Sequence, residues 1–144
     1  ASIELIDKAG IRALVANESN KLRLINVWAT WCGPCREELP EFVTMHRMYR
    51  KRDFELITIA ADLPEKKEQA LAVLKEEHAS GKNLLFQGRN EYELAEALDV
   101  QWQGALPYTL LVAPGGKIIY RKQDRIQPLE VRQAIVDYLG RVYK

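Results

Sequence analysis

Short apolar runs alternate with segments of helical periodicity along the first two thirds of this 144-residue chain, and the alternation restricts the folds open to it. The runs predicted as strands are residues 3–6, 22–28, 54–60 and 83–87. The predicted helices are residues 10–16, 34–50, 64–79 and 92–98. Because parallel strands need long crossover connections, which are usually helical, this order predicts a largely parallel sheet.

The last third of the chain has a different pattern. Residues 108–113 and 117–121 read as strands joined by a Pro114-Gly115-Gly116 turn, which predicts an antiparallel hairpin. A closing helix is predicted over residues 128–142 from its apolar stripe. We therefore expect an α/β fold with a mixed central β-sheet and helices on both faces.

Composition limits the number of domains and the classes of partner. A chain of 144 residues with 47% hydrophobic content can build one continuous core, so we expect residues 1–144 to form a single domain and a monomer. The 21 Lys and Arg residues nearly balance the 20 Asp and Glu residues. A net charge of +1 favours neither nucleic acid nor an anionic membrane as a partner.

The sequence lacks the signals of membrane insertion. No run of about 18 apolar residues is present, and the chain opens on Ala-Ser instead of a basic stretch followed by an apolar one. We therefore predict no transmembrane helix and no signal peptide. Because the first residue is not Met, a processed form that has lost an N-terminal signal or anchor is also compatible with the sequence.

The only two cysteines stand as Cys32-Gly33-Pro34-Cys35, between a predicted strand and a predicted helix. A Cys-x-x-Cys pair in this setting is typical of a redox site. Unpaired N–H groups and the helix dipole favour an anion at a helix start, which lowers the pKa of the first thiol. We predict that Cys32 is the nucleophile.

Cys35 is predicted to resolve the mixed disulfide that Cys32 forms with a substrate, because the second thiol is held close to the first. Pro34 suits the first turn of a helix, where an N–H is not needed. Gly33 would allow a substrate backbone to approach closely. We expect Gly33 and Pro34 to contact the substrate.

A structural disulfide and a zinc site are two other interpretations of the cysteine pair. A structural disulfide that closes so short a loop removes little entropy from the unfolded chain. A closed zinc site needs four ligands, and His46 and His78, the only histidines, do not have paired-ligand spacing. We predict no metal, and we interpret His46 as a packed or surface residue.

Trp31-Cys32-Gly33-Pro34-Cys35 resembles the active-site motif of thioredoxins, and Pro40 resembles the proline that kinks their active-site helix. Leu106-Pro107-Tyr108-Thr109 resembles the cis-proline loop of the same superfamily. The resemblance implies a thioredoxin-like fold over nearly the whole chain and a cis Leu106-Pro107 peptide bond. It also implies that Leu106 and Pro107 lie by the active-site sulfurs and bind an extended substrate.

Within that superfamily the chain is more similar to the TlpA/ResA-like thiol-disulfide oxidoreductases. Asn26 stands where classical thioredoxins have a buried aspartate, six residues before Cys32. Glu38 matches an acidic residue that this subgroup places three positions after the second cysteine, close to the thiols. The helix and strand predicted between residues 64 and 87 resemble its additional α-β insert, whereas its N-terminal hairpin is missing or shortened here.

Glu38 has two interpretations. It is either a third catalytic residue that adjusts the thiols or a solvated glutamate favoured by the helix dipole. Trp31, directly before Cys32, is expected on an exposed rim in contact with substrate. For Trp28, Trp102 and Tyr108, packing in or beside the core is the expected role.

The sequence as a whole predicts a cofactor-free reductase of disulfides in other proteins, which a thiol electron donor keeps reduced. The resemblance implies an extracytoplasmic location, the bacterial periplasm or a membrane anchor facing it, with the cytoplasm as the alternative. A peroxiredoxin-like peroxidase is a second hypothesis. That family usually has the motif Pro-x-x-x-Thr-x-x-Cys, but Ile25 and Ala29 stand here in place of its Pro and Thr. A thioredoxin-fold copper chaperone is a third hypothesis, although those proteins have a Cys-x-x-x-Cys pair with a distal ligand His, whereas only two residues separate the cysteines here.

Overall fold

A computed structural model describes residues 1–140 of the chain. One six-stranded sheet runs through it in the order β1-β4-β3-β2-β5-β6. The strands are β1 Glu4–Ile6, β2 Leu22–Trp28, β3 Phe54–Ala60, β4 Lys82–Phe86, β5 Tyr108–Ala113 and β6 Lys117–Gln123. The helices are α1 Lys8–Ala16, α2 Gly33–Tyr49, α3 Lys67–Glu76, α4 Glu91–Leu98 and α5 Pro128–Leu139, with a 3₁₀ turn η1 at Pro64–Lys66.

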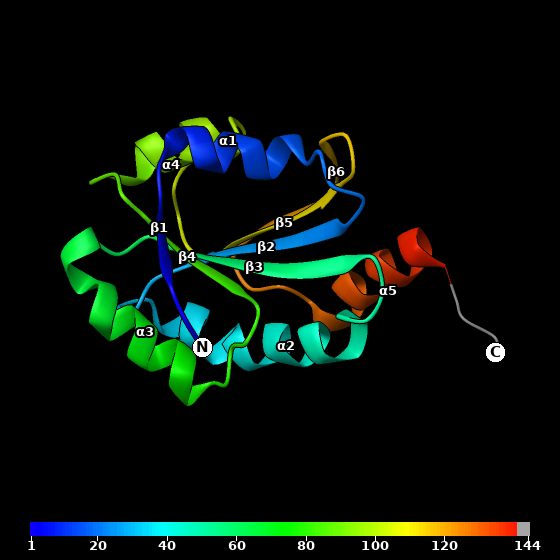
Figure 1. Ribbon diagram of the computed structural model, residues 1–144, viewed down its shortest axis with the longest axis horizontal. Coiled ribbons are helices and arrows are strands. Elements are labelled where there is room, and N and C mark those ends of the chain that lie inside the picture. The colour runs from blue at the N-terminus through cyan, green and yellow to red at the C-terminus, as the bar shows by residue number, and fades with distance from the viewer. Residues whose placement is uncertain (141–144) are drawn as a thin grey trace.

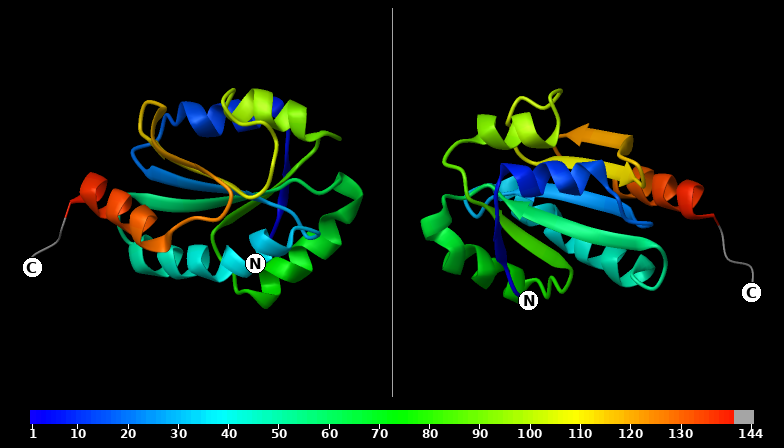
Figure 2. Two further views of the ribbon diagram at one scale, coloured as in Figure 1. Left: turned by 180° about the vertical axis from the view of Figure 1, so that it is seen from behind. Right: turned by 45° about the horizontal axis from the view of Figure 1, so that its top comes forward.

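The sheet is mixed, as the sequence predicts. Strands β1, β4, β3 and β2 pair in parallel, whereas β5 pairs antiparallel with both β2 and β6. Helices α1 and α4 cover one face, and α2, α3 and α5 cover the other (Figure 1). The view from behind shows the same three layers (Figure 2).

The core consists of one apolar cluster on the α1/α4 face and two on the opposite face, because successive strand residues point to alternate sides of the sheet. Strands β2 and β3 supply residues to both faces, and in each strand every residue is buried except the second, which is half-buried, as expected for central strands. The cluster at the start of α2 contains Cys32, Cys35 and Leu39 with Trp28 and Ala60. The candidate redox pair is thus part of the packed interior.

Several predicted boundaries agree with the structure, since β2, β3 and β5 match residue for residue. Helix α1 begins two residues earlier than predicted. The reason is Asp7, whose carboxylate accepts the Gly10 backbone N–H at 2.8 Å and caps the helix.

The helix predicted over residues 64–79 is wrong in its form. The segment starts as the 3₁₀ turn η1, continues as α3 and ends at Glu76, instead of running on to residue 79. His78, with a φ of 58°, turns the chain out of the helix. The closing helix ends at Leu139, and residues 141 and 142 of its predicted span lie outside the described residues.

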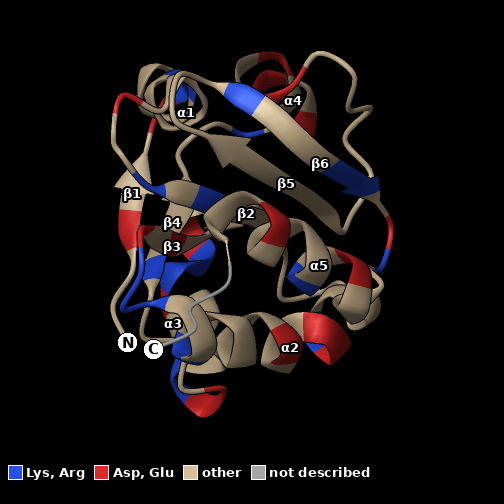
Figure 3. Ribbon diagram, turned by 90° about the vertical axis from the view of Figure 1, so that its right-hand side faces the viewer, with Lys and Arg blue, Asp and Glu red and all other residues tan. Residues whose placement is uncertain are grey.

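Acidic and basic residues are interspersed over the elements (Figure 3), consistent with the net charge of +1. Among residues 1–140, no helix has the length and apolar character needed to cross a bilayer.

Candidate dithiol site

The two cysteines stand where β2 passes into α2. Cys32 is the N-cap residue of α2, and its Sγ accepts the Cys35 backbone N–H at 3.3 Å. The pair is joined as a disulfide with a Cα–Cα distance of 5.3 Å. Cys32 is 6% exposed whereas Cys35 is fully buried, so only the first sulfur borders solvent. The N-cap position places that sulfur at the positive end of the helix dipole.

Gly33 and Pro34 form the first turn of α2 and are both exposed. A Cβ at Gly33 would meet no atom within 4 Å, so packing within the chain does not require glycine here. Proline at this position leaves no helix N–H unsatisfied. Pro40 lies inside α2, as the thioredoxin resemblance implies.

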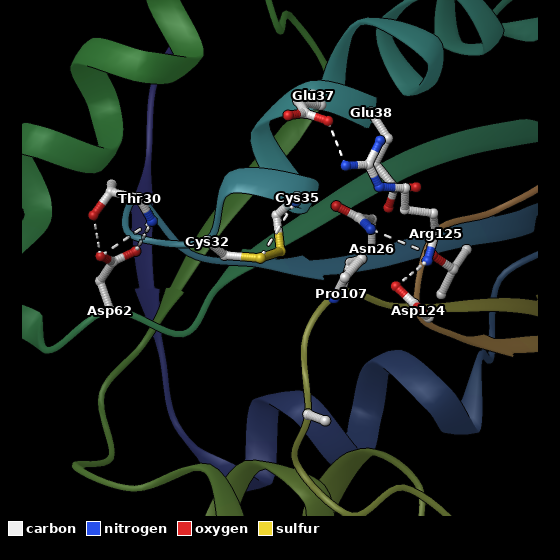
Figure 4. Close-up of a disulfide and its surroundings, with 12 residues drawn as sticks. Asn26, Thr30, Cys32, Cys35, Glu37, Glu38, Asp62, Pro107, Asp124 and Arg125 are labelled. Atoms are coloured by element: carbon white, nitrogen blue, oxygen red, sulfur yellow. Dashed lines mark hydrogen bonds and ion pairs between the residues drawn. A yellow bond between two sulfur atoms is a disulfide. The ribbon is translucent and has the colours of Figure 1, made fainter.

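The segment just before Cys32 is held by a contact between Thr30 and Asp62 that was not predicted from the sequence. Asp62, 3% exposed, accepts the Thr30 backbone N–H at 3.0 Å and the Thr30 hydroxyl. Figure 4 shows this pair on one side of the disulfide.

Trp31, between Thr30 and Cys32, is 72% exposed and lines a hollow of about 320 Å³ with Leu63. Through Trp31 this hollow adjoins Cys32 along the chain.

The Leu106-Pro107 peptide bond is cis, the conformation expected from the resemblance. Leu106 packs against the apolar cluster that contains both cysteines. Leu106 also makes no backbone hydrogen bond within residues 1–140. Contact between Pro107 and the Cys32 sulfur stays a prediction.

Asn26 belongs to a row of four buried polar residues that crosses the sheet behind α2. The row runs Thr109, Asn26, Thr58, Asn83 in register over β5, β2, β3 and β4. Asn26 donates to the Thr109 hydroxyl at 3.3 Å, and the Thr58 hydroxyl bonds Asn83 at 2.7 Å. The Asn26 Oδ1 atom is buried without a hydrogen bond among the described residues.

Glu38 is not a solvated helix glutamate, because its side chain is 6% exposed. Its Oε2 accepts the Ile126 backbone N–H at 2.9 Å, and its buried Oε1 has no partner among the described residues. Burial raises the pKa of Glu38 to about 7, against the opposing effects of the Ile126 hydrogen bond and of Arg125. No hydrogen bond within residues 1–140 joins Glu38 to either sulfur, and Figure 4 shows it on the Arg125 side of the pair.

The remaining aromatic predictions are confirmed. Trp28 is fully buried, and the rings of Trp102 and Tyr108 stack at 5.0 Å. The Tyr108 hydroxyl donates to Asp99, a buried carboxylate that also pairs with Arg121. Within the part of the chain that the structure describes, no three His, Cys, Asp or Glu residues group as metal ligands.

Sequence reasoning missed Asp62 and the 123–126 segment beside Glu38. Asp62 lies two residues after the end of β3, and Thr30 lies two residues after the end of the neighbouring parallel strand β2. Because the carboxyl ends of parallel strands meet at one edge of a sheet, these two residues come together. That signal was available in the sequence. The contact between Ile126 and Glu38 joins residues 88 apart and had no local signal.

Residues 4–121 match the model of the AhpC/TSA family. The chain belongs to this family. The ResA-like resemblance is also confirmed, because the chain is 26% identical over 115 residues to the thiol-disulfide oxidoreductase ResA of Bacillus subtilis. That match covers 80% of this chain and 60% of the relative, and further ResA matches cover 45% and 61% of theirs. This AhpC/TSA member thus spans about three fifths or less of its curated relatives' length.

Solved structures confirm the thioredoxin-like fold. The thioredoxin domain of a thiol-disulfide oxidoreductase from Bacteroides vulgatus superposes with a TM-score of 0.68 at 19% identity, covering 84% of this chain and 81% of that one. A thiol-disulfide oxidoreductase from Bacteroides fragilis superposes with a TM-score of 0.62 at 27% identity, covering 81% and 82%.

Proposed function

We propose that this AhpC/TSA member is a thiol-disulfide oxidoreductase that reduces disulfides of other proteins through Cys32 and Cys35. The observation that carries the proposal is the position of the pair. Cys32 caps a helix N-terminus at the protein surface, and Cys35 lies buried directly behind it. A thiolate at Cys32 would keep the Cys35 N–H bond and gain from the helix dipole.

The catalytic cycle follows from this asymmetry. The Cys32 thiolate attacks one sulfur of the substrate disulfide, forms a mixed disulfide and releases the other sulfur as a thiolate, which takes up a proton. Cys35, deprotonated, then attacks the Cys32 sulfur and expels the second substrate thiolate. Two electrons pass to the substrate, and the Cys32–Cys35 disulfide remains. An external dithiol returns it to the reduced form.

The residues around Cys32 would hold the substrate chain. Leu106 packs against the cysteine cluster and makes no backbone hydrogen bond among residues 1–140, so we assign to it and Pro107 the binding of an extended substrate's backbone. Gly33 and Pro34 are exposed next to Cys32, and the space that a Cβ at Gly33 would fill is open to a substrate. Trp31 offers an exposed aromatic face to the substrate's side chains.

Glu38 would raise the pKa values of the two thiols. It lies three residues, nearly one helical turn, beyond Cys35, and an ionised carboxyl at this distance disfavours a second negative charge on the dithiol. Glu38→Gln should therefore lower the thiol pKa values and shift the pH profile of exchange. Glu41→Gln, an exposed change on the same helix, is the control. Unchanged profiles in Glu38→Gln would limit Glu38 to a structural role.

The setting of the reaction is part of the same proposal. The Gly-Pro pair between the cysteines favours the reducing direction, and the ResA-like resemblance favours an extracytoplasmic location over the cytoplasm. We propose a monomer with one domain, which acts on disulfide-bearing proteins and receives electrons from an upstream thiol. Equilibration of the pair with glutathione buffers would give its reduction potential, and a value near that of an oxidising catalyst would reverse the direction.

The function is tested by reduction of insulin disulfides with dithiothreitol as electron source. The wild-type protein should accelerate the reaction, and Cys32→Ser should abolish the acceleration. The same preparation is given hydrogen peroxide, and separately copper followed by desalting. Peroxide consumption without insulin reduction would favour the peroxidase hypothesis, and copper retention without it would favour the chaperone hypothesis. Either result would overturn the proposal.

A further inference from the structure

Residues 123–126, called here the 123–126 turn, are the last residue of β6 and the three residues that lead from it toward α5. They contact two parts of the site at once. On one side they bond the backbone around Leu106. On the other they bond the side chains of Glu37 and Glu38 on α2. Figure 4 shows Asp124 beside Pro107 and the Arg125 side chain reaching toward Glu37 on α2.

On the first side, the turn bonds the residues before and after Leu106, which are Ala105 and Pro107, and not Leu106 itself. The Gln123 Nε2 atom donates to the carbonyl of Ala105 at 3.0 Å and to that of Pro107 at 3.2 Å. The Asp124 backbone N–H donates to the same Pro107 carbonyl at 2.9 Å. The turn thus binds the carbonyls on both sides of Leu106, and it shares the Ala105 carbonyl with the Trp102 Nε1 atom, which donates to it at 2.7 Å. Leu106 itself makes no backbone hydrogen bond among residues 1–140.

The bonds to the active-site helix start two residues after Cys35. Arg125 forms an ion pair with Glu37, and the Ile126 N–H donates to the Glu38 carboxyl at 2.9 Å. The first contact is exposed and the second is buried. Because buried hydrogen bonds are costly to break, Glu38 fixes the turn relative to the helix that carries both thiols.

We propose that the 123–126 turn sets the position of the Leu106 backbone relative to the Cys32 sulfur, with Gln123 and Arg125 as positioning residues. The inference rests on the proposed function. A protein disulfide must meet Leu106 and the Cys32 sulfur together, so a loosened turn weakens substrate binding. A small disulfide needs only the sulfur, and its reaction is independent of the turn.

The test uses Gln123→Glu, which keeps the side-chain length but removes the N–H donor, and Arg125→Gln, which removes the ion pair. Two controls match them. Gln127→Glu makes the same charge change at a neighbouring residue whose side chain does not cap α5. Arg12→Gln removes an exposed pair with Glu96, whose side chains are 55% and 65% exposed against 51% and 62% for Arg125 and Glu37.

Two substrates are compared for each variant: insulin, and 5,5′-dithiobis(2-nitrobenzoic acid) as the small disulfide. Gln123→Glu removes both Nε2 hydrogen bonds, but Trp102 and the Asp124 N–H still bind the two carbonyls. A net loss equivalent to one hydrogen bond, about 1 kcal/mol, predicts a KM for insulin raised about fivefold. A smaller rise is expected for the exposed Arg125 pair. In both variants kcat for insulin and the rate with the small disulfide should stay at wild-type values, as should both parameters of the controls. Thermal unfolding of each variant verifies that it is folded.

The outcomes separate the inference from the function beneath it. If the wild-type protein reduces insulin and both variants keep its KM, the positioning role is wrong and the function stands. If the variants slow the small disulfide as much as insulin, the turn acts on the thiols and the inference also fails. If the wild-type protein reacts with neither substrate, the proposed function itself is wrong, and the positioning role falls with it.

Discussion

Replacement of Glu38 by Gln should change how stability depends on pH. The pKa of Glu38 is raised from 4.5 to about 7 by burial. The folded protein therefore holds this proton more tightly than the unfolded chain, and stability from Glu38 is fully present below pH 4.5. It is lost as pH rises through about 7. A shift of this size corresponds to about 3 kcal/mol.

The measurement is urea unfolding of the oxidised protein at several pH values between 4.5 and about 8. Glu38→Gln retains a carbonyl oxygen for the Ile126 N–H but cannot ionise. Its stability relative to wild type should rise by about 3 kcal/mol over this range. Glu41→Gln, which removes a charge from the exposed side of α2, should show no such trend. Parallel curves for the two variants would refute a pKa raised by burial.

Two further predictions concern other residues. Asp99→Asn should cost about 2 kcal/mol near neutral pH, because Asp99 accepts from Tyr108 at 2.6 Å and Arg121 at 2.9 Å. Burial alone would raise the pKa of Asp99, but these hydrogen bonds outweigh burial and lower the pKa. The loss of stability in Asp99→Asn should therefore shrink as pH falls through the lowered pKa. Urea unfolding that shows no loss of stability near neutral pH would contradict this role of Asp99. In the reduced protein, iodoacetamide should alkylate Cys32 before Cys35, as peptide mapping by mass spectrometry would show, and the reverse order would exchange their roles.

The elements that could be predicted are those whose signal is local. Strands β2 and β3 are buried on both faces and therefore stand out as continuous apolar runs. The dithiol pair could be placed because a strand, two cysteines and a helix follow one another directly. Helix α1 begins two residues before its apolar periodicity does, because the Asp7 side chain caps it.

The contacts that could not be predicted depend on tertiary packing. A glutamate in the first two turns of a helix is usually solvated, and Glu38 is buried because the 123–126 turn covers it. The same turn binds the Pro107 carbonyl through Gln123, a residue with no distinguishing sequence pattern. His78, which ends the helical segment before Gly81, adopts a left-handed conformation that few residues other than glycine favour.

The central claim is that Cys32 attacks a substrate disulfide and Cys35 releases the product. Its most direct test is a reaction of reduced Cys35→Ser with insulin, followed by acid quenching and mass spectrometry without reductant. The account predicts a stable adduct with an insulin chain, linked through Cys32, and no adduct in Cys32→Ser. An adduct that forms in Cys32→Ser, or the absence of one in Cys35→Ser while the wild-type protein still reduces insulin, would contradict it.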